Sequence, residues 1–288
     1  MEKVKVSRII ATTAFFSSFL LLLPLVREAQ AVNCPTDSLQ AAIDVATGPS
    51  TILVSGTCSE NVIIREDKDR LILDGQGMAT ISGPDNTRAT IQIRGRGISI
   101  RNFVSITGGQ NGIQVWRRGA ADIQNNVIQS TGADGNGIVV NMHSFARITN
   151  NTIQNNGNDG IQVSENSSAR VGFLSFNDTV AAPNTIQNNG RRGITVARSS
   201  NAIIIGNTIT NNADDGVGVF RVSQADVSNN TINGNGGDGI SVGQNSGVNL
   251  GNDTGTLSLT YLMTPRSTTA AMGSEPSPIP LRTGVSGL

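Results

Sequence analysis

The sequence is poor in the residues that fill a wide globular core and in those that bind transition metals. Aromatic residues make up 3% of the chain, and there is 1 histidine. Because a core of ordinary width needs large side chains, this composition favours a narrow core lined by Ile and Val. The formal net charge of zero gives no overall attraction to nucleic acid or to an anionic membrane.

Long apolar runs are also scarce, and the clearest one lies at the N-terminus. A basic start is followed by an apolar run of 18 residues (9–26) and by the small-x-small triplet Ala29-Gln30-Ala31. This pattern predicts a signal peptide over residues 1–31 and a secreted protein, extracellular or periplasmic. The alternative is an uncleaved anchor, because about that many apolar residues can just cross a bilayer. After cleavage we expect no membrane span.

Cysteine is limited to Cys34 and Cys58, both in the part of the chain that export would leave intact. An even number of cysteines in an oxidising compartment predicts a disulfide. Metal or redox roles would need companion ligands that a chain with 1 histidine lacks.

Two short patterns recur in step along the chain. Gly-Ile-x-Val recurs at spacings of 25, 23, 33, 23 and 23 residues, and Asn-x-Ile at 25, 33, 23, 23 and 23. The shared spacing of 33 indicates one turn with ten extra residues, around residues 172–182. Periods of this size are typical of solenoids. The first frame begins at Gly112, Gly137, Gly160, Gly193, Gly216 and Gly239, and the second at Asn126, Asn151, Asn184, Asn207, Asn230 and, with Asp for Asn, Asp253.

Each frame predicts a β-strand, since its apolar residues alternate. Stacked coils would bring like residues together about every 4.8 Å, with Ile and Val columns inside. At the bend, the Asn column can pass amide hydrogen bonds from coil to coil, and Asn tolerates the left-handed backbone of a tight corner. Leucine-rich repeats and the calcium β-roll fit worse, because leucine is scarce in the frames and nothing recurs at nine residues. The predicted fold class is all-β: a single-stranded right-handed parallel β-helix (a solenoid) of about eight coils.

The start of the predicted stack carries its own cover. Residues 37–47 place apolar side chains on one helical face, with Thr36 or Asp37 as the cap and Gly48-Pro49 as the stop. A short N-terminal helix there would cover the open apolar end of the first coil. Residues 51–102 then predict two less regular coils.

The end of the predicted stack has no such cover. We expect the β-helix domain to span residues 32–255. From residue 256 to residue 288 the repeat is gone and prolines are frequent, which predicts an irregular, disordered tail. An uncovered last coil would favour self-association.

These motifs resemble a known family. A helix followed by Ile52-Leu53-Val54-Ser55-Gly56-Thr57 looks like the start of pectate-lyase-like proteins. The Gly-Ile-x-Val and Asn-x-Thr-Ile coils are similar to the repeats of carbohydrate-active and NosD-like right-handed β-helices. The resemblance covers about residues 34–254 and implies the fold, together with an interaction with polysaccharide. It does not select one activity, because that superfamily includes lyases, hydrolases, uronate epimerases, tailspikes and proteins without known chemistry.

One candidate site is the column just before each frame glycine. Asp215 and Asp238 fall on adjacent coils, which would place their carboxylates about 5–5.5 Å apart, as in a retaining glycosidase. Alternatively, the carboxylates chelate a hard cation such as Ca²⁺, or Asp159 and Asp215 flank Arg192 in an ion ladder. In lyases that look like this chain, carboxylates hold calcium and an Arg or Lys removes a proton from the uronate. Asp-Gly is also a common tight turn without chemistry. The candidate catalytic residues are Asp159, Arg192, Asp215 and Asp238.

A second candidate site is the column five residues after each frame glycine, with its neighbours. Arginine forks bind carboxylates, and an exposed aromatic ring can stack on a sugar. This edge therefore predicts a grip on an acidic polysaccharide. The alternative is a solvated edge on which Arg198 pairs with Glu165. The candidate substrate-binding residues are Trp116, Arg117, His143, Arg198 and Arg221.

Other patterns argue against an enzyme. Ser241 lies in a Gly-x-Ser-x-Gly pattern, but the one histidine, His143, would be four coils and roughly 19 Å away, too far for a general base. The outward column of the frame strands has no ionisable group. The Gly-His-Gly of polygalacturonases and the clustered Asp and His of epimerases are missing, and ligands for copper are scarce.

Two hypotheses about function follow. The first is a secreted protein that interacts with an acidic polysaccharide, as a lyase or hydrolase acting on uronates. The second is a non-catalytic scaffold or adhesin that binds glycan or protein through its stacked surface.

Overall fold

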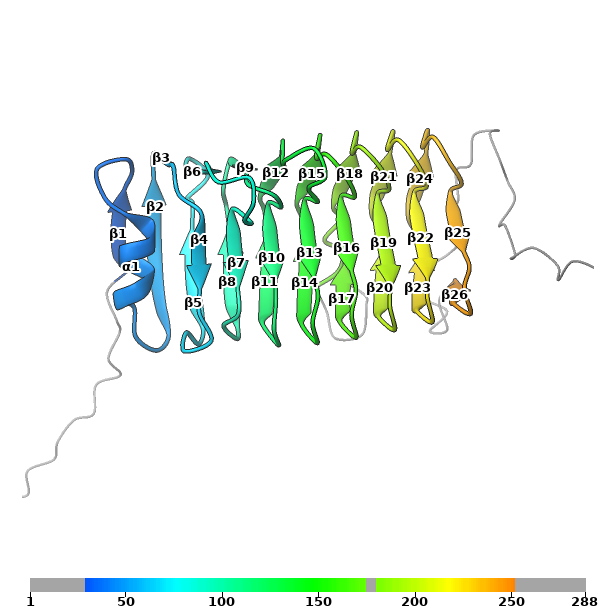
Figure 1. The fold of residues 1–288 in the computed structure, drawn as a ribbon, viewed down its shortest axis with the longest axis horizontal. Helices are drawn as coiled ribbons and strands as arrows, with labels where there is room; N and C mark the ends of the chain where they lie inside the picture. Colours follow the sequence, from blue (N-terminus) through cyan, green and yellow to red (C-terminus); the bar gives the residue numbers. More distant parts are fainter. Residues whose placement is uncertain (1–28, 175–179, 252–288) are drawn as a thin grey trace, which may run out of the picture.

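A computed structural model describes residues 29–174 and 180–251 of the chain. They form a parallel β-solenoid of about nine turns with one short helix, which confirms the predicted fold class. In Figure 1 the coils stand side by side in one row, with the N-terminal coil and the helix at one end.

Three parallel sheets run the length of the solenoid, and each coil visits them in turn. Sheet A contains β1 (Gln30–Asn33), β2 (Ser50–Ser55), β5 (Leu71–Asp74), β8 (Ile98–Arg101), β11 (Ala120–Gln124), β14 (Phe145–Thr149), β17 (Ser168–Val171), β20 (Asn201–Ile205), β23 (Gln224–Ser228) and β26 (Gly247–Leu250). Sheet B contains β3 (Thr57–Cys58), β6 (Thr80–Gly83), β9 (Ser105–Gly108), β12 (Val127–Gln129), β15 (Thr152–Gln154), β18 (Thr185–Gln187), β21 (Thr208–Thr210) and β24 (Thr231–Asn233). Sheet C contains β4 (Val62–Ile64), β7 (Ile91–Ile93), β10 (Ile113–Val115), β13 (Ile138–Val140), β16 (Ile161–Val163), β19 (Ile194–Ala197), β22 (Val217–Phe220) and β25 (Ile240–Val242).

The predicted count of eight coils matches the eight strands of sheet B and of sheet C. Sheet A has ten strands, because β1 precedes the first full coil and β26 follows the last. Gln30 and Ala31 of β1 pair with Ile52 and Leu53, although both residues fall within the predicted signal peptide. The remainder of that segment, residues 1–28, and the predicted tail, residues 256–288, lie outside the described residues.

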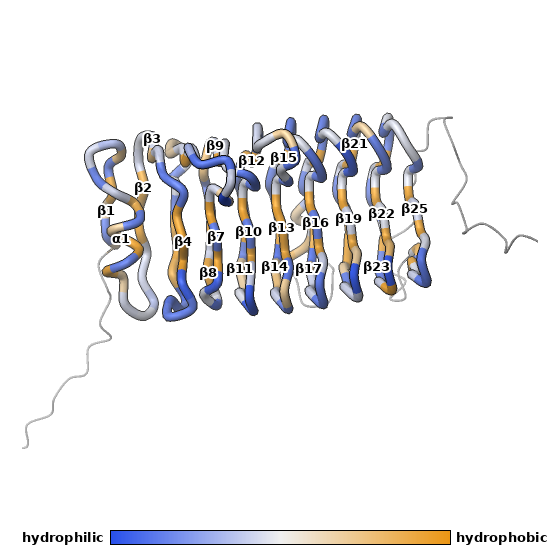
Figure 2. Tube along the Cα trace, viewed as in Figure 1, coloured by the Kyte–Doolittle hydropathy of each residue, from blue (hydrophilic) through white to orange (hydrophobic). Residues whose placement is uncertain are grey.

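The register of sheet C follows the Gly-Ile-x-Val frame. Ile113, Ile138 and Ile161 are partners on adjacent strands, and their side chains are fully buried. A Cβ on the frame residue Gly160 would lie 2.6 Å from the Ile186 side chain and 2.7 Å from the Gly193 carbonyl oxygen. Coils can therefore approach closely only with glycine there. In Figure 2 the orange apolar stretches lie along the strands and the blue polar ones at the turns.

The predicted asparagine ladder is present between sheets A and B. Asn184 shows its pattern: its side-chain oxygen accepts from Asn151 Nδ2 at 3.0 Å, and its own Nδ2 donates to Asn207 Oδ1 at 2.9 Å. The left-handed backbone falls one residue earlier than the ladder, at Asn125 and Asn150 for example, because the ladder side chains point inward. The ladder runs through Asn126, Asn151, Asn184, Asn207 and Asn230.

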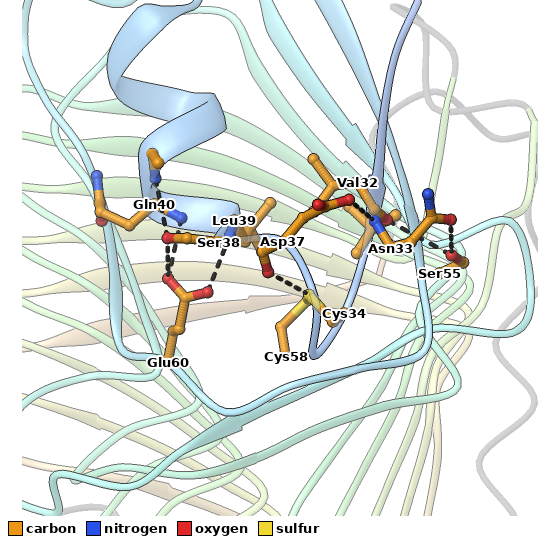
Figure 3. Close-up of a disulfide and its surroundings, with 12 residues drawn as sticks. Val32, Asn33, Cys34, Asp37, Ser38, Leu39, Gln40, Ser55, Cys58 and Glu60 are labelled. Atoms are coloured by element: carbon orange, nitrogen blue, oxygen red, sulfur yellow. Dashed lines mark hydrogen bonds between the residues drawn. A yellow bond between two sulfur atoms is a disulfide. The ribbon is translucent and has the colours of Figure 1, made fainter.

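Helix α1 (Leu39–Val45) covers the first coil, within the predicted range of 37–47. Its N-cap is Ser38 rather than Thr36 or Asp37. Asp37 is not available, since its carboxylate accepts from the backbone N–H of Asn33 at 2.8 Å. Glu60, from the first coil, accepts from the backbone N–H groups of Leu39 and Gln40 (Figure 3), which satisfies the free donors of the first helical turn.

The predicted disulfide between Cys34 and Cys58 is present, and it ties the segment before α1 to β3 (Figure 3). The predicted insertion lies between β17 and β18, where Phe173 and Ala181 form an isolated antiparallel bridge. No helix within the described ranges is long and apolar enough to cross a membrane.

Candidate functional site

Sheet C is bordered by two kinds of turn that differ in burial. We call the residues between a strand of sheet B and the next strand of sheet C the entering turn (188–193 before β19). The residues between a strand of sheet C and the next strand of sheet A are the leaving turn (198–200 after β19). The candidate catalytic residues lie in entering turns, and the candidate substrate-binding residues lie in leaving turns or directly beside them.

In the entering turns, the candidate carboxylates accept hydrogen bonds from backbone N–H groups. Asp159 Oδ1 accepts from the backbone N–H of Arg192 at 3.1 Å, and Asp215 Oδ1 accepts from that of Asp238 at 3.0 Å. Asn136 does the same for Asp159 at 3.1 Å. The column therefore joins neighbouring coils, as a tight-turn ladder would.

Arg192 connects this ladder to a cluster of charges. Its Nε lies 2.7 Å from Asp215 Oδ2 and its Nη2 lies 3.1 Å from Asp214 Oδ2. Its guanidinium carbon lies 4.7 Å from the centre of the Phe220 ring, a cation–π distance. Gly218 makes room for this packing, because a Cβ there would lie 2.9 Å from Cδ of Arg192. Of the ion ladder considered as one alternative, Arg192 pairs with Asp215, whereas Asp159 contacts Arg192 through the backbone N–H of that residue.

Asp159 is fully buried, and burial raises the pKa of its carboxyl group. Its Oδ2 has no hydrogen-bond partner among the described residues; the nearest cation is Arg191, whose Nη1 lies 4.0 Å away. The hydroxyl of Thr195, also buried, lies beside this carboxyl group and acts to lower its pKa, but burial outweighs it.

The chelation of Ca²⁺ predicted as one alternative does not fit this arrangement. Calcium requires six to eight oxygen ligands, whereas Asp214 and Asp215 both bind the guanidinium of Arg192. Residues 29–174 and 180–251 contain no group of three or more His, Cys, Asp or Glu side chains that could hold a metal ion.

The leaving turns share an unusual backbone. In each leaving turn from the one after β10 onward, two consecutive residues have a positive φ, between 51° and 67°. The backbone N–H of the second residue donates to the carbonyl of the first residue on the next coil, as Ser199 does to Arg221 at 3.0 Å. In all but the first of these turns a serine follows, and from Ser167 onward it joins the preceding coil, as Ser200 Oγ does by accepting from Ser167 N at 3.2 Å. The pairs are Arg117 and Arg118, Met142 and His143, Glu165 and Asn166, Arg198 and Ser199, Arg221 and Val222, and Gln244 and Asn245.

Side chains at these left-handed positions are mostly exposed. Arg198 pairs with Glu165 at 3.1 Å, as the alternative to substrate binding predicted. Arg221 makes no ion pair with any residue that the structure describes. Ser241 lies on β25 and His143 follows β13, four coils apart, so the two do not form a catalytic pair.

A groove of about 370 Å³ joins the two borders of sheet C across β16, β19 and β22. Its floor contains the outward residues of the strands, including Gln162 and Thr195, and arginines stand on both sides. The lining residues are Gln162, Ser164, Arg191, Arg192, Thr195, Ala197, Arg198, Phe220, Arg221 and Gln244. The structure thus brings Arg192, Arg198 and Arg221 of the predicted residues into one site.

The family model described as the right handed beta helix region matches residues 111–256, just over half of the 288 residues. The chain belongs to the right-handed β-helix family. No match is found among curated proteins.

Solved structures of this fold resemble the chain at low identity. The A-module of the mannuronan C-5 epimerase AlgE4 of Azotobacter vinelandii is 18% identical, with 73% of this chain and 71% of that chain covered and a TM-score of 0.47. Pectate lyase Pel9A is 12% identical, with 76% and 74% covered and a TM-score of 0.45. An alginate lyase from Paenibacillus sp. str. FPU-7 is 15% identical, with 77% and 97% covered and a TM-score of 0.30. At these identities the likeness concerns the fold alone.

Within this β-helix, Trp116, Arg117 and His143 lie outside the groove. Arg117 stacks on the Trp116 ring at 4.0 Å, and Arg94, from the preceding coil, lies 4.8 Å from the same ring. The indole N–H donates to the sulfur of Met142. Trp116 is therefore engaged by its own neighbours rather than presented as an open stacking platform.

Sequence reasoning missed two arginines of this surface, Arg191 and Arg94. Arg191 is next to Arg192 in the chain, and its place beside the groove could have been inferred from that adjacency. Arg94 follows Ile93 just as Trp116 follows Val115, so extending the Gly-Ile-x-Val register one coil earlier would have found it.

Proposed function

We propose that this protein binds an acidic polysaccharide of the polyuronate class in the arginine-lined groove of sheet C, without cleaving it. The observation that carries the proposal is the groove lining, in which all four ionisable residues are arginines (Arg191, Arg192, Arg198 and Arg221). Arg221 makes no ion pair with the described residues, whereas the other three also pair with acids beside the groove. Guanidinium groups bind carboxylates through paired N–H donors, which matches the one carboxylate per sugar of a polyuronate.

The polar lining supports a sugar rather than a small inorganic anion. Gln162, Ser164 and Gln244 line the groove beside the arginines, and amide and hydroxyl groups can bond the hydroxyls of a pyranose ring. The groove volume of about 370 Å³ is in the range of sites for small organic ligands.

The candidate catalytic residues support binding better than chemistry. A general acid or base must come within hydrogen-bond reach of the substrate. Asp159 is fully buried, and both carboxylate oxygens of Asp215 already accept hydrogen bonds. Arg192 is held by Asp214 and Asp215, so its guanidinium is fixed in place. Catalytic roles for these three residues and Asp238 remain a prediction from the sequence.

The proposal places the protein outside the cytoplasm, in the extracellular space or the periplasm. The Cys34–Cys58 disulfide supports this location, because disulfides persist in oxidising compartments. A polysaccharide ligand is typically met there.

The test is calorimetric titration of the protein with an oligogalacturonate. The double variant Arg198→Asn/Arg221→Asn removes two cations, and Asn is well tolerated at positive φ. We expect its affinity to fall at least about tenfold and its dependence on NaCl to weaken, because screening acts on fewer charges. The matched control Arg147→Gln/Arg170→Gln removes two cations from sheet A and should keep the affinity of the original protein. Equal affinity of both double variants for the oligosaccharide would contradict the proposal.

A further inference from the structure

A second group of cations lies on the same edge of sheet C, in the leaving turn after β10. Arg117 and Arg118 are exposed and make no ion pair with the described residues. The guanidinium of Arg117 lies flat enough on Trp116 for a cation–π contact, at 4.0 Å from the ring centre. Stacking occupies the face of a guanidinium and leaves its N–H edges free to bind a carboxylate. This turn therefore presents an oriented cation of the same kind as the groove does.

The backbone holds this turn in register with the groove. Arg117 and Arg198 have nearly the same φ, 51° and 58°. The hydrogen bonds from Arg118 to Met142, from His143 to Glu165 and from Asn166 to Arg198 join the turns one coil at a time. Equivalent side chains therefore leave the surface in the same direction, one coil apart, at about 4.8 Å. Arg117 is three coils from Arg198, about 14 Å along the axis.

The surface between the two cationic groups does not repel a polyanion. The intervening turns carry Met142 and His143 on one coil and Glu165 and Asn166 on the next. Glu165 is the one acid among these four residues, and Arg198 neutralises it at 3.1 Å. A sugar ring in an extended chain also advances by a length similar to one coil, so a linear polymer can follow the edge.

Accepting the proposed function, on which this step rests, we infer that the turn formed by Trp116, Arg117 and Arg118 is a second binding subsite for the same polyuronate. One chain lies along the leaving turns, parallel to the solenoid axis, and contacts both the groove and this subsite. A chain too short to span three coils binds the groove alone. For a longer chain, contact at the second subsite is intramolecular, so affinity rises without any new kind of contact.

The experiment compares a digalacturonate with an octagalacturonate by calorimetric titration at a fixed NaCl concentration. We expect the octasaccharide to bind at least about tenfold more tightly than the disaccharide, after correction for the number of ways it can bind. Arg117→Asn/Arg118→Asn, chosen because Asn tolerates the left-handed backbone, should abolish that advantage and leave disaccharide affinity unchanged. Arg147→Gln/Arg170→Gln, with the same loss of charge on sheet A, should retain the advantage.

Three outcomes would overturn the inference, and two of them leave the proposed function standing. If both ligand lengths bind the original protein with equal corrected affinity, or if Arg117→Asn/Arg118→Asn keeps the octasaccharide advantage, the second subsite is wrong while the groove stands. If neither ligand binds at any length, the proposed function fails and takes the subsite with it.

Discussion

The two turns that border sheet C are built from the same repeat, yet they use their side chains in opposite ways. In the entering turn, Asn189 is buried and forms hydrogen bonds with both neighbouring coils. In the leaving turn, Arg221 occupies a left-handed position with its side chain exposed. Side chains of the first kind hold the stack together, while those of the second kind are free to vary from coil to coil. If the proposed binding holds, we expect its specificity to depend mainly on the leaving side.

The largest difference between the two turns should appear in a single substitution of the buried ladder. Asn189 Oδ1 accepts from both the backbone N–H and Nδ2 of Asn156, at 3.2 Å and 2.9 Å. Asn189→Ala would remove the acceptor of the Asn156 backbone N–H and of one N–H of its side-chain amide, whose other N–H keeps the Ile128 carbonyl. Each unsatisfied buried donor costs about 1–3 kcal/mol. We expect the free energy of unfolding, measured by urea denaturation, to fall by about 3 kcal/mol. A loss below about 1 kcal/mol would show that the ladder is not the main bond between coils.

Asn189 belongs to a second asparagine ladder, in the entering turns, and the sequence contained its pattern although the two frames did not include it. Asn156, Asn189, Asn212 and Asn235 recur at 33, 23 and 23 residues, the same spacings as the frames. They lie four residues before each frame glycine, so the signal was present and detectable. The inward columns and the insertion were predictable for the same reason, because burial and close approach repeat in every coil.

The left-handed pairs and the groove were not predictable in this way. Arg117, Met142, Glu165 and Arg198 share one backbone conformation but no side-chain chemistry, since the carbonyl and N–H groups of the turn form the bonds. The role of Glu60 at the start of α1 was missed because it lies 20 and 21 residues from Gln40 and Leu39, whose N–H groups it satisfies. Side-chain directions, such as that of Arg192 over Phe220, depend on packing between coils.

The two turns also contain ion pairs of unequal strength. Arg192, largely buried, pairs with Asp214 and Asp215, whereas Arg198 and Glu165 form an exposed pair. Removing one partner of a largely buried pair leaves an uncompensated charge, so Arg192→Gln should lower the free energy of unfolding by about 2 kcal/mol. Arg198→Gln should cost less than about 1 kcal/mol, because exposed pairs contribute little. Equal losses in denaturant titrations would remove this distinction.

The pKa of Asp159, in an entering turn, and the pKa of Asp74, near the N-terminal end, are shifted in opposite directions. Burial raises the pKa of Asp159 above the ordinary aspartate value of about 3.9. Between the unfolded and the folded pKa, the folded state holds more protons, so stability must fall as pH rises through that window. Asp159→Asn keeps an acceptor for Arg192 N and should flatten this fall when unfolding is followed between pH 4 and pH 7.

Asp74 provides the control with the opposite sign. Burial alone would raise its pKa, but hydrogen bonds from Asn102, Gln76 and Arg101 outweigh burial and lower it. The Asp74 carboxylate contributes to stability above the ordinary aspartate pKa, and this contribution is lost as pH falls through the lowered pKa of the folded state. Asp74→Asn should therefore change the acid limb of the stability profile and leave the limb between pH 4 and pH 7 as it was. If Asp159→Asn altered only the acid limb as well, the raised pKa would be wrong.

The smallest effect on stability is expected at Arg221, and the comparison of the two turns depends on it. The side chain is exposed and makes no ion pair with the described residues, and the backbone φ of the residue is 57°. Asn adopts this region more readily than most residues, whereas a β-branched residue is strained there. Arg221→Asn should thus change the free energy of unfolding by less than about 0.5 kcal/mol, and Arg221→Val should lower it by about 1 kcal/mol or more. Both variants lose the same cation and should weaken oligogalacturonate binding equally. If the affinity instead fell only in the less stable variant, the backbone conformation of the leaving turn, rather than its charge, would determine ligand binding.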